Sequence, residues 1–556
     1  MVAPPPVEVD RPLPAVAGRA AALQRLATER FHVLVVGGGV VGAGALLDAT
    51  SRGLRAALVE QADIASGTSG RSSRLIHGGL RYLEQLRFGL VAEALAERSR
   101  LLRLAPHLVS LEPFLFPVYG IPLVHQAFYG SGIFLYDILG SYRDGGFAKH
   151  LTPRNVLAYA PSLRRKGLTG GIVYHDGVED DARLALTVLR TAQAMGAVAA
   201  TRVHAEAPFD ANGRVAGARV RDLESGEAFE VRADHVIDAT GVWAARPAER
   251  FAATTAGEAF HPSRGSHIVI RRERLDARGG ITLRIPGRVV FVIPWPGHWI
   301  IGTTDHPDGR QPEQIAAPND DVDELLDTVN RTTDLHLSRA DIVGTYAGMR
   351  PLVGDPAGST VKASREHRVS GDPSGLVRIS GGKYTTYRVM ARDVVDAAVG
   401  TGMATARPSE TADLPLLGAA PRPALDQLAV QLALEPGMDG RTARALVDRH
   451  GTEATDVLAM GRALDLVRPL GPEVDQLEAE VAWAARRELA ASLDDVVARR
   501  MRLVQVLPDR GASIAPRVAE ILGAELGWDA ARQASEVAGY LATARREYGV
   551  PWPETA

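Results

Sequence analysis

Apolar runs and glycine-rich turns alternate near the start of the chain. Residues 32–36 (HVLVV) form a short apolar run that ends in three consecutive glycines. The next segment, VVGAGALLDATSRG, repeats apolar residues at helical spacing and places Gly53 where a helix C-cap is expected. Residues 56–60 (AALVE) have the pattern of a second buried strand. This order of strand, glycine turn, helix and strand predicts a βαβ unit.

The rest of the chain changes texture twice. HVIDATG at 235–241 and VRISGG at 377–382 have the pattern of strands that end in glycine. Between them, segments such as RVVFVIPWPGHWIIGTTD are strand-rich and punctuated by Gly, Pro and Trp, which predicts a mostly antiparallel sheet. After a Pro-rich linker near 404–423, Ala, Leu, Arg and Glu dominate in a helical pattern. An α/β region followed by an all-helical region is therefore expected.

One acidic cluster is better explained by helix capping than by metal binding. In DGVEDDARL (176–184), Asp180 or Asp181 immediately precedes the helical pattern ARLALTVLRTAQAMG, which ends at Gly196. A short acidic side chain at that position accepts hydrogen bonds from the first backbone N–H groups of a helix. The cluster is thus predicted to begin a helix.

Composition and charge exclude several classes of protein. The 556 residues carry a formal net charge of −3, so no nucleic-acid partner is expected. The absence of cysteine excludes disulfides, Fe–S clusters, thiolate zinc sites and catalytic thiols, and with no HExxH pair we expect no metal. The chain has no run of about 18 apolar residues and no cationic start before an apolar core. We therefore expect a cytoplasmic protein without a membrane span or signal peptide.

Glycine spacing in the βαβ unit fits a dinucleotide-binding turn. Gly37, Gly39 and Gly42 make a GxGxxG motif, in which the first glycine forms the turn, the second lets a pyrophosphate approach and the third lets helix and strand pack. The helix N-terminus then faces the phosphates with its partial positive charge. Glu60 ends the second strand, where a carboxylate would accept hydrogen bonds from ribose hydroxyls. The motif leaves open whether the dinucleotide carries nicotinamide or flavin.

Two further polar residues have ordinary interpretations when they are considered alone. His267, in RGSHIVI, begins a predicted strand and is typical of a structural histidine. Arg350, in TYAGMRPL, is typical of a surface ion-pair partner. Neither residue identifies a reaction by itself.

Taken together, the motifs resemble those of one family. GGGVVGAG, TSGRSSRLIHGGLRYLE, YHDGVEDDARL, DATGVWA, RGSHIVI, FVIPWPGHWIIGTTD, TYAGMRPL and SGGKYTTYR occur in the order found in flavin-dependent glycerol-3-phosphate dehydrogenases. The late segment EVAWAARRELAASLDDVVARRMRL resembles the helical C-terminal domain of that family. The resemblance extends from about residue 31 to about residue 545.

The resemblance implies a fold and a domain order. The expected fold is α/β, with a glutathione-reductase/D-amino-acid-oxidase-type FAD-binding fold, an interleaved antiparallel substrate domain and a C-terminal all-α domain. We expect a disordered Pro-rich tail at 1–24, an FAD-dependent oxidoreductase domain at 25–408 and the helical domain at 409–556. The FAD part is expected at about 25–110, 170–255 and 355–408, and the substrate part at about 111–169 and 256–354.

The resemblance also implies a reaction. The family oxidises sn-glycerol 3-phosphate to dihydroxyacetone phosphate by hydride transfer from C2 to N5 of FAD, and the electrons pass to a membrane quinone. The expected partners are therefore the substrate, a quinone and a peripheral membrane surface on the inner face of the cell membrane. A homodimer is compatible with the resemblance. The alternative is a glycerol-3-phosphate oxidase that uses oxygen and produces hydrogen peroxide.

Site residues are carried over from the matching motifs. His267, Arg350 and Lys383 are expected to be catalytic, with His267 as the base, although Arg350 or Lys383 could instead stabilise the alkoxide. Several cations suit a doubly charged phosphate, and a histidine suits proton removal near neutral pH. The expected substrate-binding residues are Arg81, Tyr82, His267, Arg350, Arg365 and Lys383. The expected FAD-binding residues are Gly37, Gly38, Gly39, Val40, Val41, Gly42, Glu60, Gln61, Thr68, Ser69, Ser72, Ser73, Leu75, Gly241, Gly382, Lys383 and Thr385.

One stretch fits the resemblance less closely, and two other function classes remain. Residues 111–140 are apolar and aromatic, which favours core under a sheet over a membrane-facing or quinone-access surface.

An amino-acid or sarcosine-type oxidase needs a single cation for its carboxylate substrate, so the excess of Arg and Lys argues against it. A non-catalytic scaffold built on the helical domain is the third alternative, and flavin reduction by substrate distinguishes it.

Overall fold

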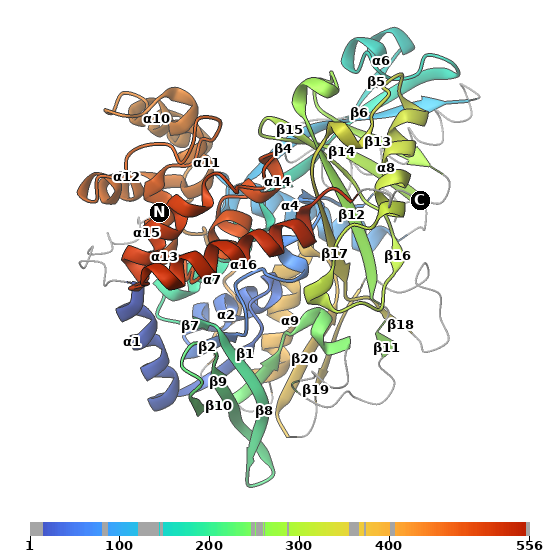
Figure 1. Ribbon diagram of the computed structural model, residues 1–556. Helices are drawn as coiled ribbons and strands as arrows, with labels where there is room; N and C mark the ends of the chain where they lie inside the picture. The colour runs from blue at the N-terminus through green and yellow to red at the C-terminus, as the bar shows by residue number, and fades with distance from the viewer. Residues whose placement is uncertain are drawn as a thin grey trace, which may run out of the picture.

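The computed structural model describes residues 15–79, 87–120, 144, 148–245, 251, 259–260, 262–285, 288–354, 366–371, 374–400 and 406–551. Three of the predicted substrate-binding residues, Arg81, Tyr82 and Arg365, lie outside these ranges. Figure 1 shows two sheet-containing parts side by side, with the C-terminal helices lying along both of them.

A mostly parallel sheet forms the first part. Its strands run in the order β19-β20-β10-β1-β2-β7, and neighbours from β20 to β7 are parallel. Their bounds are β1 Arg30–Val36, β2 Ala56–Glu60, β7 Val198–Thr201, β10 Ala228–Asp238, β19 His367–Gly371 and β20 Leu376–Gly381. The predicted strands at 32–36 and 56–60 are confirmed as β1 and β2, and helix α2 (Val40–Ser51) joins them. The predicted βαβ unit is therefore present.

Both faces of this sheet are covered. On one face α2 packs against α7 (Asp181–Ala194) and α9 (Tyr387–Val399), and their apolar side chains form one core with β1 and β2. On the other face a second core involves the strands β8 (Val203–Ala211) and β9 (Arg214–Asp222). The predicted cap of α7 is confirmed, because the Asp180 carboxylate accepts a hydrogen bond from Arg183 N at 3.3 Å.

The expected tail at 1–24 is wrong over its last ten residues. Helix α1 spans Ala15–Thr28, in a segment rich in alanine and leucine, which are strong helix formers. Leu26 is fully buried with Phe31 of β1, and Arg19 pairs with Asp222 at 2.6 Å. Burial of apolar residues on the sheet stabilises this helix. The prediction missed it because the residues just before it are rich in proline.

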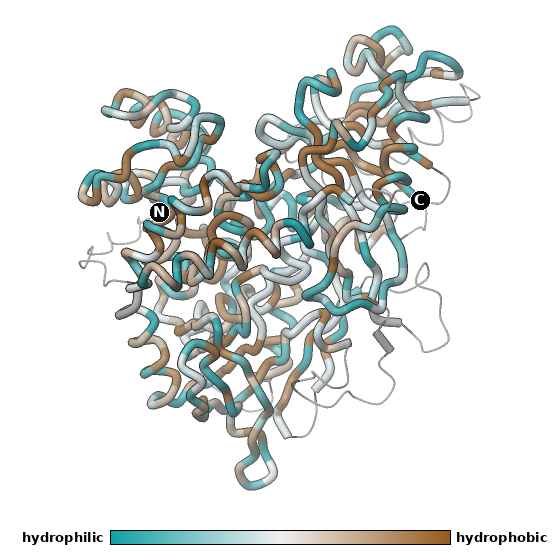
Figure 2. The backbone as a smooth tube through the Cα atoms, viewed as in Figure 1, coloured by the Kyte–Doolittle hydropathy of each residue, from teal (hydrophilic) through white to brown (hydrophobic). Residues whose placement is uncertain are grey.

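The second part is the predicted, mostly antiparallel sheet. Its strands run in the order β16-β12-β15-β14-β13-β4-β6-β3, with β17 paired to β12 and β5 to β6. Their bounds are β3 Leu75–Ile76, β4 Val109–Tyr119, β5 Lys149–Leu151, β6 Leu168–Glu179, β12 Ser263–Arg271, β13 Gly280–Ile285, β14 Arg288–Trp295, β15 His298–Gly302, β16 His306–Pro307 and β17 Ile342–Arg350. Short strands β11 (Ala259–Phe260) and β18 (Val353–Gly354) form a separate pair. Figure 2 shows hydrophobic residues concentrated along this sheet.

Part of the aromatic stretch at 111–140 belongs to the core. Residues 111–119 lie in β4, in the middle of the sheet, and Phe114, Leu115, Phe116 and Val118 are buried. The prediction of core is confirmed there, and residues 121–140 lie outside the described residues. Helices α6 (Pro153–Tyr159) and α8 (Asn319–Thr332) contribute to a second core of this sheet, which includes Leu115 of β4.

The C-terminal region is helical, as predicted. It contains α10 Arg422–Leu432, α11 Gly440–His450, α12 Ala454–Ala463, α13 Glu478–Arg487, a π-helical turn at Asp495–Arg500, α14 Leu503–Val506, α15 Ala515–Leu526 and α16 Ala530–Tyr548. One continuous core joins these helices to α4 (Phe88–Leu104) and to the antiparallel sheet. Among the described helices, none is both long enough and apolar enough to cross a membrane.

Buried ion pairs join this helical region to the parallel-sheet part. Arg190 of α7 donates to both carboxylate oxygens of Glu453 at 2.7 Å, and Arg183 donates to Glu488 at 2.7 Å. Asp63, in the loop after β2, accepts from Arg500 at 2.8 Å and from Arg499 at 2.5 Å. Separating the partners of such a pair would leave an uncompensated charge, which is costly where the charge is buried. These contacts therefore hold the two parts in one relative position.

Candidate active site

A large cavity of about 990 Å³ lies between the two sheets. The glycine turn after β1, the loop after β2, the ends of β12 and β17 and the loop after β20 all contribute to its wall. Every described residue predicted to bind FAD or substrate lines the cavity except Gly42. Segments that are far apart in the sequence thus meet at the predicted site.

Each glycine of the fingerprint has its own steric reason. Gly37 has φ +110°, and a Cβ there would lie 2.6 Å from the carbonyl oxygen of Ala239. A Cβ on Gly42 would lie 1.9 Å from the carbonyl oxygen of Gly37. A Cβ on Gly39 would contact only Ser69 Oγ, at 3.2 Å. Gly37 and Gly42 therefore let the turn and α2 pack, whereas Gly39 borders the open cavity.

Glu60 lies at the end of β2 and faces the same turn. Its carboxylate accepts hydrogen bonds from Gly38 N at 2.6 Å and from Ala62 N at 2.7 Å. Burial raises the pKa of this carboxyl, and the two backbone donors oppose that effect. The buried carboxylate is an acceptor suited to ribose hydroxyls. The glycine turn and the helix N-terminus beside it suit the pyrophosphate of a dinucleotide.

Residues 66–75, which we call the cavity loop, contribute small polar side chains to the cavity wall. Ser69 Oγ accepts from Val40 N at 3.0 Å, and Thr68 Oγ donates to the Met349 carbonyl at 2.5 Å. Ser73 Oγ lies 2.8 Å from Nε2 of His267. The loop therefore joins the glycine turn to the antiparallel sheet, and its small residues allow a flat ring system to approach closely.

His267 is held rigidly in the wall of the cavity. Its ring stacks on Tyr346 with 4.5 Å between centroids and 9° between planes, and only 2 % of the residue is exposed. A Cβ on Gly302 would lie 2.2 Å from the imidazole, so glycine is required beside it. Burial, together with the positive charges of Arg350 and Arg74, holds the pKa of His267 well below its ordinary value of 6.5. The imidazole is therefore unprotonated at neutral pH.

Arg350 projects into the cavity from the end of β17. Its guanidinium donates to Asp305 at 3.1 Å, to Thr303 Oγ at 3.1 Å and to the Thr304 carbonyl at 3.3 Å. A Cβ on Gly265 would lie 2.4 Å from that guanidinium, so this glycine makes room for it. Arg350 is therefore an oriented cation and not the exposed ion-pair partner that the isolated sequence favours.

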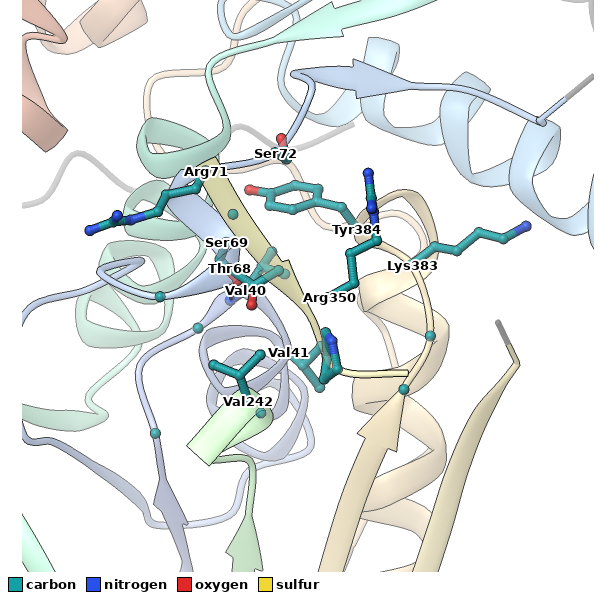
Figure 3. A pocket seen from close by; sticks show the side chains of 18 of the residues that line it. Val40, Val41, Thr68, Ser69, Arg71, Ser72, Val242, Arg350, Lys383 and Tyr384 are labelled. Carbon is teal, nitrogen blue, oxygen red and sulfur yellow. Dashed lines mark hydrogen bonds between the residues drawn. The ribbon is translucent and has the colours of Figure 1, made fainter. Parts of the chain in front are cut away.

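Lys383 brings a second positive charge to the cavity from the loop between β20 and α9. Figure 3 shows Arg350 and Lys383 on the side of the cavity away from Arg71. Arg71 donates instead to Glu547 of α16 at 2.6 Å. The Arg71 guanidinium thus bonds to the helical region, whereas Arg350 and Lys383 supply positive charge to the cavity.

Sequence reasoning assigned no role to several other cavity residues. His77 lines the cavity with its ring edge-on to Phe291 at 5.9 Å, and Thr282 lines it while bonded to Tyr174 at 2.7 Å. Tyr384 also lines the cavity (Figure 3). His77 and Tyr384 lie within the motifs RSSRLIHGGLRYLE and SGGKYTTYR, so the signal was their proximity to predicted site residues.

Comparisons with known families and sequences agree with this geometry. A family model described as FAD dependent oxidoreductase matches residues 32–388, and one described as C-terminal domain of alpha-glycerophosphate oxidase matches residues 409–533. Glycerol-3-phosphate dehydrogenase 2 of Mycobacterium tuberculosis is 46% identical over 533 residues, which cover 96% of this chain and 91% of the relative. The human mitochondrial glycerol-3-phosphate dehydrogenase is 36% identical over 525 residues, covering 90% and 71%.

Solved structures give the same result. The glycerol-3-phosphate dehydrogenase from Bacillus halodurans complexed with FAD aligns with a TM-score of 0.79 and 26% identity, covering 97% of this chain and 98% of that one. The L-alpha-glycerophosphate oxidase from Mycoplasma pneumoniae with FAD bound has a TM-score of 0.54 and 19% identity, covering 69% and 98%. At that identity the oxidase shares the fold alone.

Proposed function

The chain belongs to the FAD-dependent glycerol-3-phosphate dehydrogenases, and from that membership we propose that it oxidises sn-glycerol 3-phosphate to dihydroxyacetone phosphate and passes the electrons to a membrane quinone. One observation carries the proposal: a single cavity joins a dinucleotide-type glycine turn to His267, Arg350 and Lys383. FAD, when bound, supplies a ring nitrogen that accepts a hydride from the substrate. The chain's own residues hold the two molecules and move the remaining proton.

Cofactor binding is assigned to the parallel-sheet side of the cavity. The N-terminus of α2 at Gly39 and Val40 would hold the pyrophosphate, and Glu60 would accept from ribose hydroxyls. The small residues of the cavity loop would lie beside the ring. This assignment is supported by the space at Gly39, where a Cβ would meet one hydroxyl and otherwise open cavity.

Substrate binding is assigned to the cations on the opposite side. The phosphate of glycerol 3-phosphate carries about two negative charges, and an arginine fork binds such a group through two donors. Arg350 and Lys383 both line the cavity, and we propose that Arg81, Tyr82 and Arg365 complete the same binding site. A phosphate fixed by several donors also fixes the position of C2, which is the reacting carbon.

His267 is assigned as the base that takes the proton of the C2 hydroxyl. Oxidation of an alcohol removes a hydride from carbon and a proton from oxygen, so the site needs an unprotonated acceptor. The neutral imidazole meets that need, and Ser73 and Tyr346 fix its orientation. Arg350 favours the reaction in a second way, because its positive charge stabilises negative charge on the reacting oxygen.

The pH dependence of flavin reduction follows from this assignment. The pKa of His267 lies well below 6.5 because the ring is buried beside Arg350 and Arg74, so protonation to the inactive imidazolium occurs only at low pH. At saturating substrate, the rate constant for flavin reduction should stay level from about pH 8 down through pH 6.5 and fall only below that value. Rapid-mixing measurements under anaerobic conditions test this. An acidic limb centred near pH 6.5 would contradict a buried, neutral base.

Anaerobic bleaching of the yellow protein by glycerol 3-phosphate tests the reaction itself. We expect stoichiometric flavin reduction by this substrate and little by glycerol. Reoxidation then identifies the acceptor: we expect fast reoxidation by a quinone in vesicles and association with the inner face of the cell membrane at low salt. A wholly soluble protein that makes peroxide stoichiometrically would establish the oxidase instead. The names of the relatives at 36–46% identity favour the dehydrogenase.

A further inference from the structure

The helical C-terminal region contacts the back of the cavity loop, on the side away from the cavity. We infer that Arg502 is a positioning residue for the active site: it fixes residues 70–72 of the loop and thereby the contact between Ser73 and His267. This inference rests on the proposed function, because it concerns the same site. It gives the helical region a part in the reaction, through the loop that orients His267.

Arg502 is nearly inaccessible and uses its whole guanidinium at this boundary. It is 3 % exposed and donates to the Gly70 carbonyl at 3.0 Å and to Asp180 at 2.9 Å. It also donates to Asp181, whose other oxygen accepts from Ser72 N at 2.8 Å. One side chain from the helical region thus holds the loop directly at Gly70 and through Asp181 at Ser72.

The loop residues that Arg502 restrains lie beside the side chains that orient His267. The Ser72 carbonyl accepts from the Tyr346 hydroxyl at 2.9 Å, and Tyr346 is the ring on which His267 stacks. The next residue, Ser73, places its hydroxyl 2.8 Å from His267 Nε2. A shift of Ser72 therefore moves two of the contacts that orient His267.

Two further contacts from the helical region hold the same loop. Arg74 donates to Gln505, and its guanidinium lies 3.7 Å from the centroid of the Trp295 ring. Arg71 donates to Glu547 at 2.6 Å. Both loop arginines therefore bond to the helical region, Arg74 to α14 and Arg71 to α16.

The backbone of the loop requires such restraint. Arg74 has φ +55° and Ala65, just before the loop, has φ +59°, in the left-handed region that non-glycine residues occupy at a cost of about 1–2 kcal/mol each. Conformations of that kind persist where the surroundings determine them. The contacts from the helical region supply this restraint, and loss of Arg502 removes those at Gly70 and Ser72.

Arg502→Met tests the inference, with Arg190→Met as the matched control. Arg190 is also buried, also joins the two parts through a bidentate ion pair and does not line the cavity. We expect Arg502→Met to slow flavin reduction by at least ~10-fold, because small misplacements of reacting groups cost up to ~10²-fold in rate. The substrate dissociation constant should stay within ~3-fold of the wild-type value. Arg190→Met should change the rate by less than ~2-fold while destabilising the fold to a similar extent.

A readout that needs no substrate separates this inference from the proposed function. Hydrogen exchange of the peptide covering residues 66–76 should be at least ~10-fold faster in Arg502→Met than in Arg190→Met. The Gly70 carbonyl loses its donor, and Asp181, which accepts from Ser72 N, loses the guanidinium that orients it. If Arg502→Met does not fold, Glu547→Gln keeps the shape and weakens the contact with Arg71, and it should accelerate the same exchange to a smaller extent. Equal exchange and equal flavin reduction in the variant and the control would overturn the inference. Changed exchange with no substrate reduction in the wild-type protein would instead contradict the proposed function.

Discussion

Replacement of Arg350 by alanine is expected to lower kcat/KM for glycerol 3-phosphate by at least ~10²-fold and to leave the FAD content unchanged. Loss of one partner of a buried charge pair costs about 2–5 kcal/mol, and each ~1.4 kcal/mol corresponds to one decade in rate. Arg350 is oriented by Asp305, Thr303 and Thr304, so its charge is in place before substrate binds. Its loss therefore weakens phosphate binding and loosens the position of C2, and kcat should fall as well as kcat/KM.

Arg264 provides the matched control for this prediction. It lies on β12, where Met349 is its register partner on β17, and it pairs with Asp308 and Asp321 without lining the cavity. Arg264→Ala should reduce stability but leave kcat/KM within ~10-fold of wild type in the protein that folds. Glycerol, which lacks the phosphate, should be a very poor substrate and should lose far less to Arg350→Ala. Full activity of both Arg350→Ala and Tyr82→Phe would contradict the proposed phosphate site.

Local patterns predicted those features of the fold that local physics determines. The βαβ unit follows from apolar runs and from glycines whose positions tolerate no Cβ, as at Gly42. The cap at Asp180 follows from the preference of a helix N-terminus for a carboxylate. These signals depend on a few neighbouring residues, so they can be recognised in a single sequence.

Long-range pairing could not be predicted in the same way. Arg502 contacts Gly70 and Asp181 across more than 300 residues of sequence, and Arg71 contacts Glu547 across 476. Nothing near these arginines marks which acid each one will meet. The resemblance predicted His267 and Arg350 as site residues, whereas their contacts with Tyr346 and Asp305 became visible only in the folded chain.

Replacement of Gly39 by valine is expected to abolish FAD binding in a protein that still folds. Gly39 is the N-cap of α2, with φ −71° and ψ 173°, which is ordinary extended backbone for any residue. A Cβ there would meet only Ser69 Oγ, at 3.2 Å, so the fold accommodates a side chain if this hydroxyl moves by a few tenths of an ångström. The two methyl groups of valine then occupy the cavity at the helix N-terminus, where the pyrophosphate would lie.

Two other glycines provide controls for this prediction. Gly42→Ala should instead prevent the turn from forming, because its Cβ would lie 1.9 Å from a backbone oxygen, and the loss should appear as unfolding. Gly539→Val, in α16, meets no atom within 4 Å and should bind FAD like the wild type. The flavin-to-protein ratio after desalting, measured beside circular dichroism, distinguishes the three cases. In the wild type, acid precipitation should release the flavin, since the chain has no cysteine for a thioether link; flavin retained in the precipitate would indicate a histidyl link. A folded Gly39→Val protein with normal flavin content would show that the pyrophosphate lies elsewhere, and the role assigned to the glycine turn would then be wrong.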